Sequence, residues 1–395
     1  EPRYQTVAGP AYSCALQPSG GDNLGDSVYC WGENKHRQIR LDDSAEHPLP
    51  QEIDFDKPIR QLDVAASHGC AVDNEGNVSC WGSNVDGQVA PEDDTGEAAF
   101  APIPVDLSSS TAVKVCAGER SSCALTSRGE VFCWGTNTAS LLNRNTSVIV
   151  GSKITPTKVP FDNGATFFHD LACGPEHRCA IDATNRAHCW GADSHGQLGA
   201  EDFDPQNPKT STIVSDGNAA AIEFEQVFAG PKASCGITPE GYLHCWGAEY
   251  VSRGRGGDGA PIAATNRPFW GIGDVRSEAL LGEERIVTVS MGGEHLCASS
   301  SDGEVFCWGE GRYGELAAFD SSPETLFGEL LATPEALEPI VFERAAEIAS
   351  VAVGLDHSCA ITRAGQPFCW GDGARGQRGN DTTGIALSRQ SMIVA

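Results

Sequence analysis

The stretch Ser122–Asn137 reads SCALTSRGEVFCWGTN and predicts a β-hairpin. Two short apolar segments flank Ser127–Gly129, a three-residue loop whose glycine can take the positive φ that such a turn needs. Counting outward from this loop places Cys123 directly opposite Cys133. Directly opposed residues of an antiparallel pair lie about 4.5–5.5 Å apart at Cα, which suits a disulfide. The stretch therefore predicts a hairpin closed by a disulfide.

The hairpin pattern recurs along the chain. Seven Cys-Trp-Gly triplets follow one another at intervals of 50 to 62 residues. In six of them another cysteine stands ten positions before the triplet, and in the first the separation is sixteen. The predicted pairs are Cys14 with Cys30, Cys70 with Cys80, Cys123 with Cys133, Cys179 with Cys189, Cys235 with Cys245, Cys297 with Cys307, and Cys359 with Cys369. So many disulfides indicate an oxidising compartment: secreted, periplasmic or at the cell surface.

Each period holds further strand candidates beside its hairpin. A β-like segment ending in glycine precedes the hairpin, as at residues 112–118, and a proline-flanked segment precedes that, as at residues 101–105. About four short strands and no helix are the content of one propeller blade. A single blade cannot bury both of its faces, whereas seven arranged radially can. We therefore predict an all-β fold: a seven-bladed β-propeller of four-stranded blades, forming one domain over residues 1–395.

The order of the segments leads to an expectation about ring closure. Only residues 4–9 precede the first hairpin, so its blade lacks a proline-flanked outer strand. The chain continues after the last hairpin with strand candidates at residues 385–387 and 390–394. We expect this C-terminal segment to supply the missing strand to the N-terminal blade.

The repeat resembles that of a known family. Residues 174–199 read GPEHRCAIDATNRAHCWGADSHGQLG, and residues 354–379 follow the same pattern. This pattern is similar to the repeat of the regulator-of-chromosome-condensation superfamily of seven-bladed propellers. The resemblance covers nearly the whole chain and implies the fold. It does not select a function, because such folds host several unrelated ones.

Two cysteines lie outside the hairpins. Cys116 and Cys173 stand on the glycine-terminated strands of neighbouring blades, at adjacent positions. They form either an interblade disulfide or two buried thiols. The tryptophans of the seven triplets are interpreted as wedges between blades.

Metal binding is the competing interpretation of the cysteines. Histidines precede several of them: His68, His177, His188, His244, His295 and His357. A zinc site needs four converging ligands, usually with closer cysteine spacing, and no acidic loop has the spacing of a calcium site. We therefore expect no metal and no cofactor, with the histidines packing near the inner strands.

The strongest departure from the repeat follows Trp246. Where other repeats read Gly-Gln-Leu-Gly, this one has a glycine-rich stretch with several arginines and an aromatic pair. Arginine and aromatic residues are enriched at binding hot spots. The candidate partner-binding residues are Arg253, Arg255, Arg267, Phe269 and Trp270. The alternative is that Phe269 and Trp270 only begin the next outer strand and pack on its blade.

The composition of the chain limits the classes of partner that it can bind. With 54 acidic and 27 basic residues, the net charge is −27. Such a surface repels nucleic acid and anionic lipid, and no run of 18 apolar residues is present to span a membrane. The chain begins at Glu1, which we interpret as a mature or trimmed chain. We expect a monomer that binds neither nucleic acid nor membrane.

No catalytic motif occurs in the sequence. The leading hypothesis is a non-enzymatic binding module that presents one propeller face to a protein or surface ligand, as a secreted enzyme inhibitor of similar fold does. The resemblance also suggests a guanine-nucleotide exchange regulator, although that role implies a reducing compartment. A structural domain of a larger surface protein, or an enzyme with a loop-built site, are the remaining alternatives.

Overall fold

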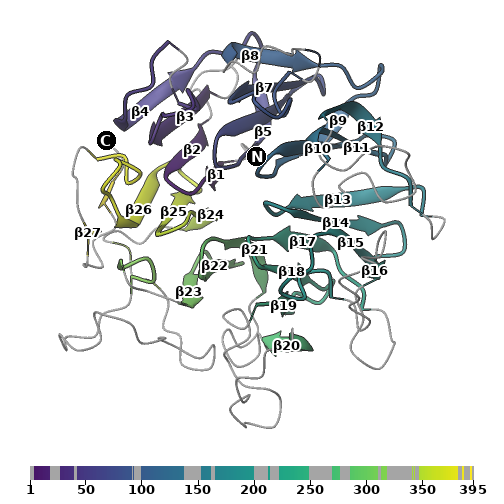
Figure 1. Ribbon diagram of the computed structural model, residues 1–395. Helices are drawn as coiled ribbons and strands as arrows, with labels where there is room; N and C mark the ends of the chain where they lie inside the picture. The colour runs from purple at the N-terminus through teal and green to yellow at the C-terminus, as the bar shows by residue number, and fades with distance from the viewer. Residues whose placement is uncertain are drawn as a thin grey trace.

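The computed structural model describes residues 4–17, 27–39, 42–90, 92, 99–137, 153–161, 165–199, 212–213, 222–248, 269–275, 285–309, 313–317, 340, 342, 347–380, 385–386 and 392–393. All regular elements in these ranges are β-strands, and no helix there is long and apolar enough to cross a membrane. The strands form seven antiparallel sheets arranged radially around a central axis (Figure 1). The seven-bladed propeller is thereby confirmed.

The blades follow the chain in order, each running outward from the axis. The first three are β1 (Gln5–Ala8), β2 (Tyr12–Gln17), β3 (Ser27–Gly32) and β4 (His47–Ile53); β5 (Ile59–Val64), β6 (His68–Asp73), β7 (Val78–Gly82) and β8 (Ala99–Val105); and β9 (Ala112–Ala117), β10 (Ser121–Thr126), β11 (Val131–Thr136) and β12 (Lys153–Lys158). Blades 4 and 5 are β13 (Phe168–Cys173), β14 (His177–Asp182), β15 (Ala187–Gly191) and β16 (Thr212–Ile213); and β17 (Gln226–Ala229), β18 (Ala233–Ile237), β19 (Leu243–Gly247) and β20 (Phe269–Val275). Blades 6 and 7 are β21 (Ile286–Met291), β22 (His295–Ser300) and β23 (Val305–Gly309); and β24 (Ile348–Val353), β25 (His357–Thr362), β26 (Pro367–Asp372), β27 (Ile385–Ala386) and β28 (Met392–Ile393).

The hairpin register is as the sequence predicts. Cys123 of β10 pairs with Cys133 of β11, and their Cα atoms are 4.1 Å apart. All seven hairpins carry the predicted disulfide. Each closes the second and third strands of one blade, so each blade is stapled internally.

The glycine after each triplet tryptophan is required by the backbone. Gly135 has a φ of 102°, which L side chains rarely adopt. A Cβ atom there would lie 2.6 Å from the carbonyl oxygen of Arg120, in the turn before β10. The backbone of this turn therefore packs directly on the end of β11, where no side chain would fit.

The hydrophobic core lies between the blades. The described buried side chains form seven clusters, each built from two neighbouring blades. The seven triplet tryptophans are at most 2% exposed, and Trp81 of blade 2, for example, packs against blade 1. The interpretation of these tryptophans as wedges between blades is confirmed.

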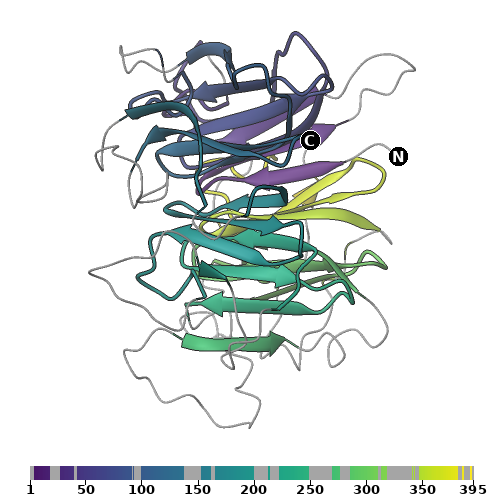
Figure 2. The ribbon, with the colours of Figure 1, turned by 90° about the vertical axis from the view of Figure 1, so that its right-hand side faces the viewer.

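The expected mode of ring closure is wrong. β27 and β28 both pair with β26 of their own blade, and blade 1 is completed by β4, which follows its hairpin. The proline-flanked segment therefore ends one blade rather than starting the next. Closure instead rests on packing of β1 beside β24 and β25 (Figure 2) and on a cluster shared by blades 7 and 1.

The two remaining cysteines join neighbouring blades. Cys116 at the end of β9 is bonded to Cys173 at the end of β13, with their Cα atoms 5.5 Å apart. Of the two alternatives, the interblade disulfide is therefore correct. All sixteen cysteines are oxidised in pairs, so none offers a thiolate to zinc.

Candidate functional site

The arginine-rich departure after Trp246 falls mostly outside the described residues. Arg253, Arg255 and Arg267 are not described, and Phe269 and Trp270 are described only as the beginning of β20. In that strand Phe269 pairs with Gly247, so the aromatic pair does begin an outer strand. A role for these five residues in partner binding stays a prediction.

Four of the flanking histidines hold neighbouring blades together. The Nε2 atoms of His68, His177, His295 and His357 lie 2.7–2.9 Å from a serine hydroxyl of the next blade. The four serines are Ser122, Ser234, Ser358 and Ser13, respectively. These histidines are buried and serve packing, as the sequence analysis expects, and the described residues contain no group of three candidate metal ligands.

The geometry determines the tautomer of His68. Ser122 donates its single hydroxyl hydrogen to the carbonyl oxygen of Gln88, 3.1 Å away. His68 must therefore donate from Nε2 to the Ser122 oxygen, which leaves its Nδ1 unprotonated. That buried Nδ1 atom has no hydrogen-bond partner. Burial lowers the pKa of each of the four histidines to about 3.

These pKa values predict a stability that falls in acid. An unfolded histidine has a pKa of about 6.5, so between roughly pH 6.5 and 3 the unfolded chain binds more protons than the folded one. The free energy of unfolding therefore decreases as the pH falls, and each histidine contributes at most about 1.4 kcal/mol per pH unit to this decrease. Burial raises the pKa of Asp63 and Asp193 to about 6, which opposes this trend between roughly pH 4 and 6. Four histidines outweigh two carboxyls, so denaturant unfolding should show falling stability from pH 6.5 to 4. Constant stability over that interval would contradict the prediction.

We call the interface between two neighbouring blades a seam. The seam between blades 3 and 4 carries a buried cation instead of the histidine. In blade 3 the histidine position holds Ser121, and in blade 4 the serine position holds Arg178. The long side chain reaches back, and its Nη2 donates to the Ser121 hydroxyl at 2.7 Å. Arg178 also donates from Nη1 to the carbonyl oxygens of Gly174 and His177. Burial lowers its pKa to about 9, partly offset by the charge of Asp63.

At two other seams the histidine–serine pair is replaced by one larger and one smaller residue. At the seam of blades 5 and 6, Ala233 and Leu296 occupy the histidine and serine positions within one apolar cluster. At the seam of blades 1 and 2, Tyr12 occupies the histidine position opposite Gly69, and its hydroxyl donates to the carbonyl oxygen of His68. A larger residue on one blade thus accompanies a smaller one on the other.

The tryptophans add a second link across the seams. The Nε1 atoms of Trp81, Trp134 and Trp246 donate at 2.9 Å to the carbonyl oxygen of a glutamine in the loop after the hairpin of the preceding blade. Trp308 has no such partner in the described structure. It faces blade 5, the blade whose Gly-Gln-Leu-Gly segment is replaced.

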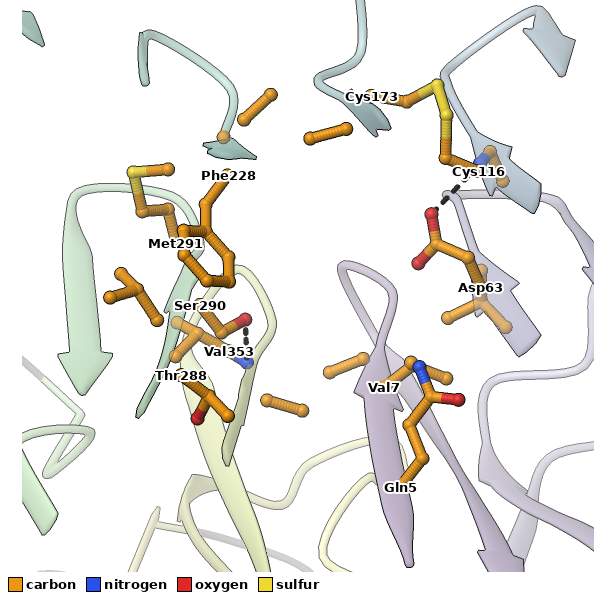
Figure 3. Close-up of a pocket in the computed structure, with 18 of the residues that line it drawn as sticks. Gln5, Val7, Asp63, Cys116, Cys173, Phe228, Thr288, Ser290, Met291 and Val353 are labelled. Atoms are coloured by element: carbon orange, nitrogen blue, oxygen red, sulfur yellow. Dashed lines mark hydrogen bonds between the residues drawn. A yellow bond between two sulfur atoms is a disulfide. The ribbon is translucent and has the colours of Figure 1, made fainter. Parts of the chain in front are cut away.

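A channel of about 1550 Å³ runs along the axis, lined by all seven inner strands. Five of its polar side chains accept a hydrogen bond from a backbone N–H of the next inner strand, at 2.7–3.1 Å. The pairs are Gln5 with Leu62, Gln61 with Val115, Asp63 with Ala117, Asp170 with Val227, and Ser290 with Val353. Figure 3 shows the channel wall, with Phe228 and Met291 on one side and Asp63 on the other.

One mouth of the channel has an apolar rim, which we call the turn-face rim. Each blade contributes the residue after the glycine or alanine that ends its inner strand: Pro10, Ala66, Glu119, Pro175, Pro231, Gly293 and Leu355. Only Glu119 is charged, although the chain has a net charge of −27. Leu355 is 50% exposed.

Backbone hydrogen bonds connect this rim from blade to blade. Glu119 donates its backbone N–H to the carbonyl oxygen of Pro175, and Leu355 does the same to Pro10. The Cys116–Cys173 disulfide lies just inside the rim, also between blades 3 and 4. The rim is therefore a preformed surface, the arrangement that lowers the entropic cost of binding.

The comparisons with known proteins agree with this architecture. A family model described as Regulator of chromosome condensation (RCC1) repeat matches residues 59–88, 112–140, 168–197, 286–315 and 348–377, and a second of the same description matches 302–361. Human E3 ubiquitin-protein ligase HERC2 is 27% identical over 372 residues, which are 91% of this chain but 7% of HERC2. Human Regulator of chromosome condensation is 23% identical over 386 residues, covering 93% of this chain and 85% of that protein.

The solved structure of yeast RCC1 (Prp20) bound to Kap60 superposes with a TM-score of 0.75 at 21% identity, covering 93% of this chain and 83% of that one. Most of the matched segments run from an inner strand through a hairpin to the loop that follows, which is the unit seen in each blade. The protein is thus a seven-bladed propeller that carries RCC1-like repeats, here with a disulfide in every blade.

Sequence reasoning missed several residues of the seams and the channel. The serines opposite the histidines were detectable, because Ser13, Ser122, Ser234 and Ser358 each stand one residue before a hairpin cysteine. Asp63 carried no such signal. Its importance comes from its position on the channel wall, which only the closed ring creates.

Proposed function

We propose that the chain is a non-enzymatic binding module of an oxidising compartment, acting as a monomer that presents its turn-face rim to a protein partner. The observation that carries this proposal is the apolar rim itself. Exposed apolar patches on an otherwise polar protein mark interaction sites, and this one surrounds a channel on a highly charged chain. The disulfides support a secreted, periplasmic or cell-surface location.

The relatives support a role in protein binding without naming the partner. The yeast propeller was solved bound to Kap60, and the study of a second Prp20p structure concerns its binding to Gsp1p and histones. Guanine-nucleotide exchange is the weaker proposal for this chain. A protein with all its cysteines paired suits an oxidising compartment, whereas small intracellular GTPases meet a reducing one.

Affinity capture from the extracellular and envelope fractions of the source tests the proposal. The intact ring should retain a partner that Leu355→Asp, on the turn-face rim, loses by at least about tenfold, because a buried unpaired charge is costly at an apolar contact. Phe167→Asp is the matched control, since Phe167 is 46% exposed and packs on the hairpin turn at Gly129, on the opposite face. Equal thermal stability of the three proteins is required.

A third variant tests the arginine-rich segment separately. It carries alanine at Arg253, Arg255, Arg267, Phe269 and Trp270. If only this variant loses the partner, the binding site lies on that segment and the turn-face rim has only a structural role. If no protein is captured by the intact ring, the binding-module proposal fails.

A further inference from the structure

We propose that the turn-face mouth of the channel receives a lysine or arginine side chain of the partner, with Asp63 as the carboxylate that recognises it. This inference rests on the proposed function and specifies the partner's chemistry. The strand registers define one level of the channel wall to which every inner strand contributes a residue.

At this level each inner strand presents the residue that pairs with the first cysteine of its hairpin. The seven residues are Val7, Asp63, Cys116, Ala172, Phe228, Ser290 and Ala352. Six are uncharged and one is an aspartate. The level lies two residues inside the glycine or alanine that ends each strand.

The charge of Asp63 is not needed for its structural contact. Asp63 accepts a hydrogen bond from the backbone N–H of Ala117 at 2.9 Å. Ser290, at the same level, makes the equivalent contact to Val353 at 3.0 Å with a neutral hydroxyl. A carboxylate at this place brings a desolvation cost, because burial raises the pKa of Asp63 to about 6. Asp63 also accepts a hydrogen bond from the backbone N–H of Val64. An ionised carboxylate can accept about four hydrogen bonds, so these two backbone donors leave capacity for a further donor.

The neighbouring cations are already engaged. Lys114 is bonded to Asp170 at 2.6 Å, and Arg178 donates to two backbone carbonyls and to Ser121. Both charges influence Asp63 from a distance, but no basic side chain in the described ranges forms an ion pair with it. Asp63 is a partly exposed residue that lines the channel, through which a cation can approach its carboxylate.

The opposite wall suits the rest of a basic side chain. Phe228 faces Asp63 across the channel, with Met291 and Val353 beside it (Figure 3). An aromatic face attracts a cation, while apolar walls accommodate the methylene stem of lysine or arginine. A carboxylate opposite an aromatic ring is therefore a fitting environment for a basic side chain, and an unfavourable one for an acidic side chain.

The depth of Asp63 matches the length of such a side chain. Ala65 at the mouth lies two residue steps along the chain from Asp63, which is about 7 Å at roughly 3.3 Å per residue. The four-carbon stem of lysine spans a similar length. The backbone of the partner would then rest on the apolar rim while its cation reaches Asp63.

Two methionines make the test direct. The chain contains only Met291 and Met392; the first lines the channel, and the second lies in β28 at the outer part of blade 7. The full chain with ¹³C-labelled methionine methyl groups is titrated with acetyl-Gly-Leu-Lys-Leu-Gly-amide. Matched peptides carry norleucine or glutamate in place of lysine. We expect the Met291 signal to shift with a Kd of about 1 mM or lower, while Met392 stays unchanged.

The variants separate recognition from folding. Asp63→Asn keeps an oxygen for the Ala117 N–H and should weaken the lysine peptide at least about tenfold. Ser290→Ala removes the equivalent neutral contact and should leave the affinity unchanged. The norleucine and glutamate peptides should bind at least about tenfold more weakly than the lysine peptide.

Three outcomes would overturn the inference: no Met291 shift at about 10 mM peptide, equal binding of the lysine and norleucine peptides, or full binding by Asp63→Asn. Its failure is distinguishable from that of the proposed function. If Leu355→Asp still loses the captured partner, the rim binds without a basic side chain. If nothing is captured, the proposed function fails whatever the peptides do.

Discussion

Reduction of the eight disulfides is expected to abolish the cooperative folding of the ring. Each hairpin disulfide closes a loop of about ten residues and contributes roughly 2–3 kcal/mol in the chain-entropy model. The total stability of a folded domain is only about 5–15 kcal/mol. The stabilisation lost with seven hairpin disulfides and the interblade disulfide is larger than this, so the apolar packing between blades cannot compensate for it. Thermal unfolding of the reduced and alkylated protein should therefore show no cooperative transition under conditions where the oxidised protein is folded.

Thiol counting provides the control for this experiment. In denaturant without reductant the protein should show no free thiol, and after reduction it should show sixteen, since every cysteine is paired. A variant with serine at Cys116 and Cys173 isolates the interblade bond, whose 57-residue separation is worth at most about 4 kcal/mol. A reduced protein with an unchanged melting temperature would show that the blades do not depend on their staples.

The seam between blades 3 and 4 provides the second large effect. Arg178→Ser should cost about 3 kcal/mol or more, because it leaves a cavity and removes a buried cation whose charge interacts favourably with that of Asp63. Adding Ser121→His should recover most of this loss, since the pair then reproduces the geometry of His68 and Ser122 at the next seam. Gly118 leaves room for the ring, as Gly174 does for His177. Urea unfolding of the wild type and the variants measures both effects.

An apolar version of the same exchange is the matched control. Ser121→Ala with Arg178→Leu reproduces the Ala233 and Leu296 pair of the seam between blades 5 and 6. Buried ionic groups can often be replaced by well-packed apolar ones at little cost, so this variant should also exceed the Arg178→Ser single variant in stability. If the histidine and serine double variant is no more stable than Arg178→Ser alone, the seams are not interchangeable modules.

The sequence by itself determined the hairpins and their seven disulfides. The two cysteines of a pair such as Cys123 and Cys133 are separated by a short turn whose glycine sets the register. Contacts within sixteen residues depend on local geometry, and a pattern repeated seven times identifies them without knowledge of the rest. Blade number followed for the same reason.

Only the tertiary structure decided which blade each outer strand joins. The segment His47–Ile53 lies between two hairpins in the chain, and the sequence alone is compatible with its pairing to either of them. Packing selects the preceding hairpin, and this choice also assigns the C-terminal strands to blade 7. The predicted closure was wrong because sequence order alone does not distinguish these two arrangements.

The seams and the channel likewise belong to the closed ring. Ser13 and His357 are 344 positions apart, yet their hydrogen bond joins the first and last blades. Asp63 and Phe228 face each other only because seven blades surround one axis. Local sequence patterns describe a blade, whereas these contacts arise from the rotation that relates each blade to the next, and that rotation is settled by how the buried side chains of two blades pack together.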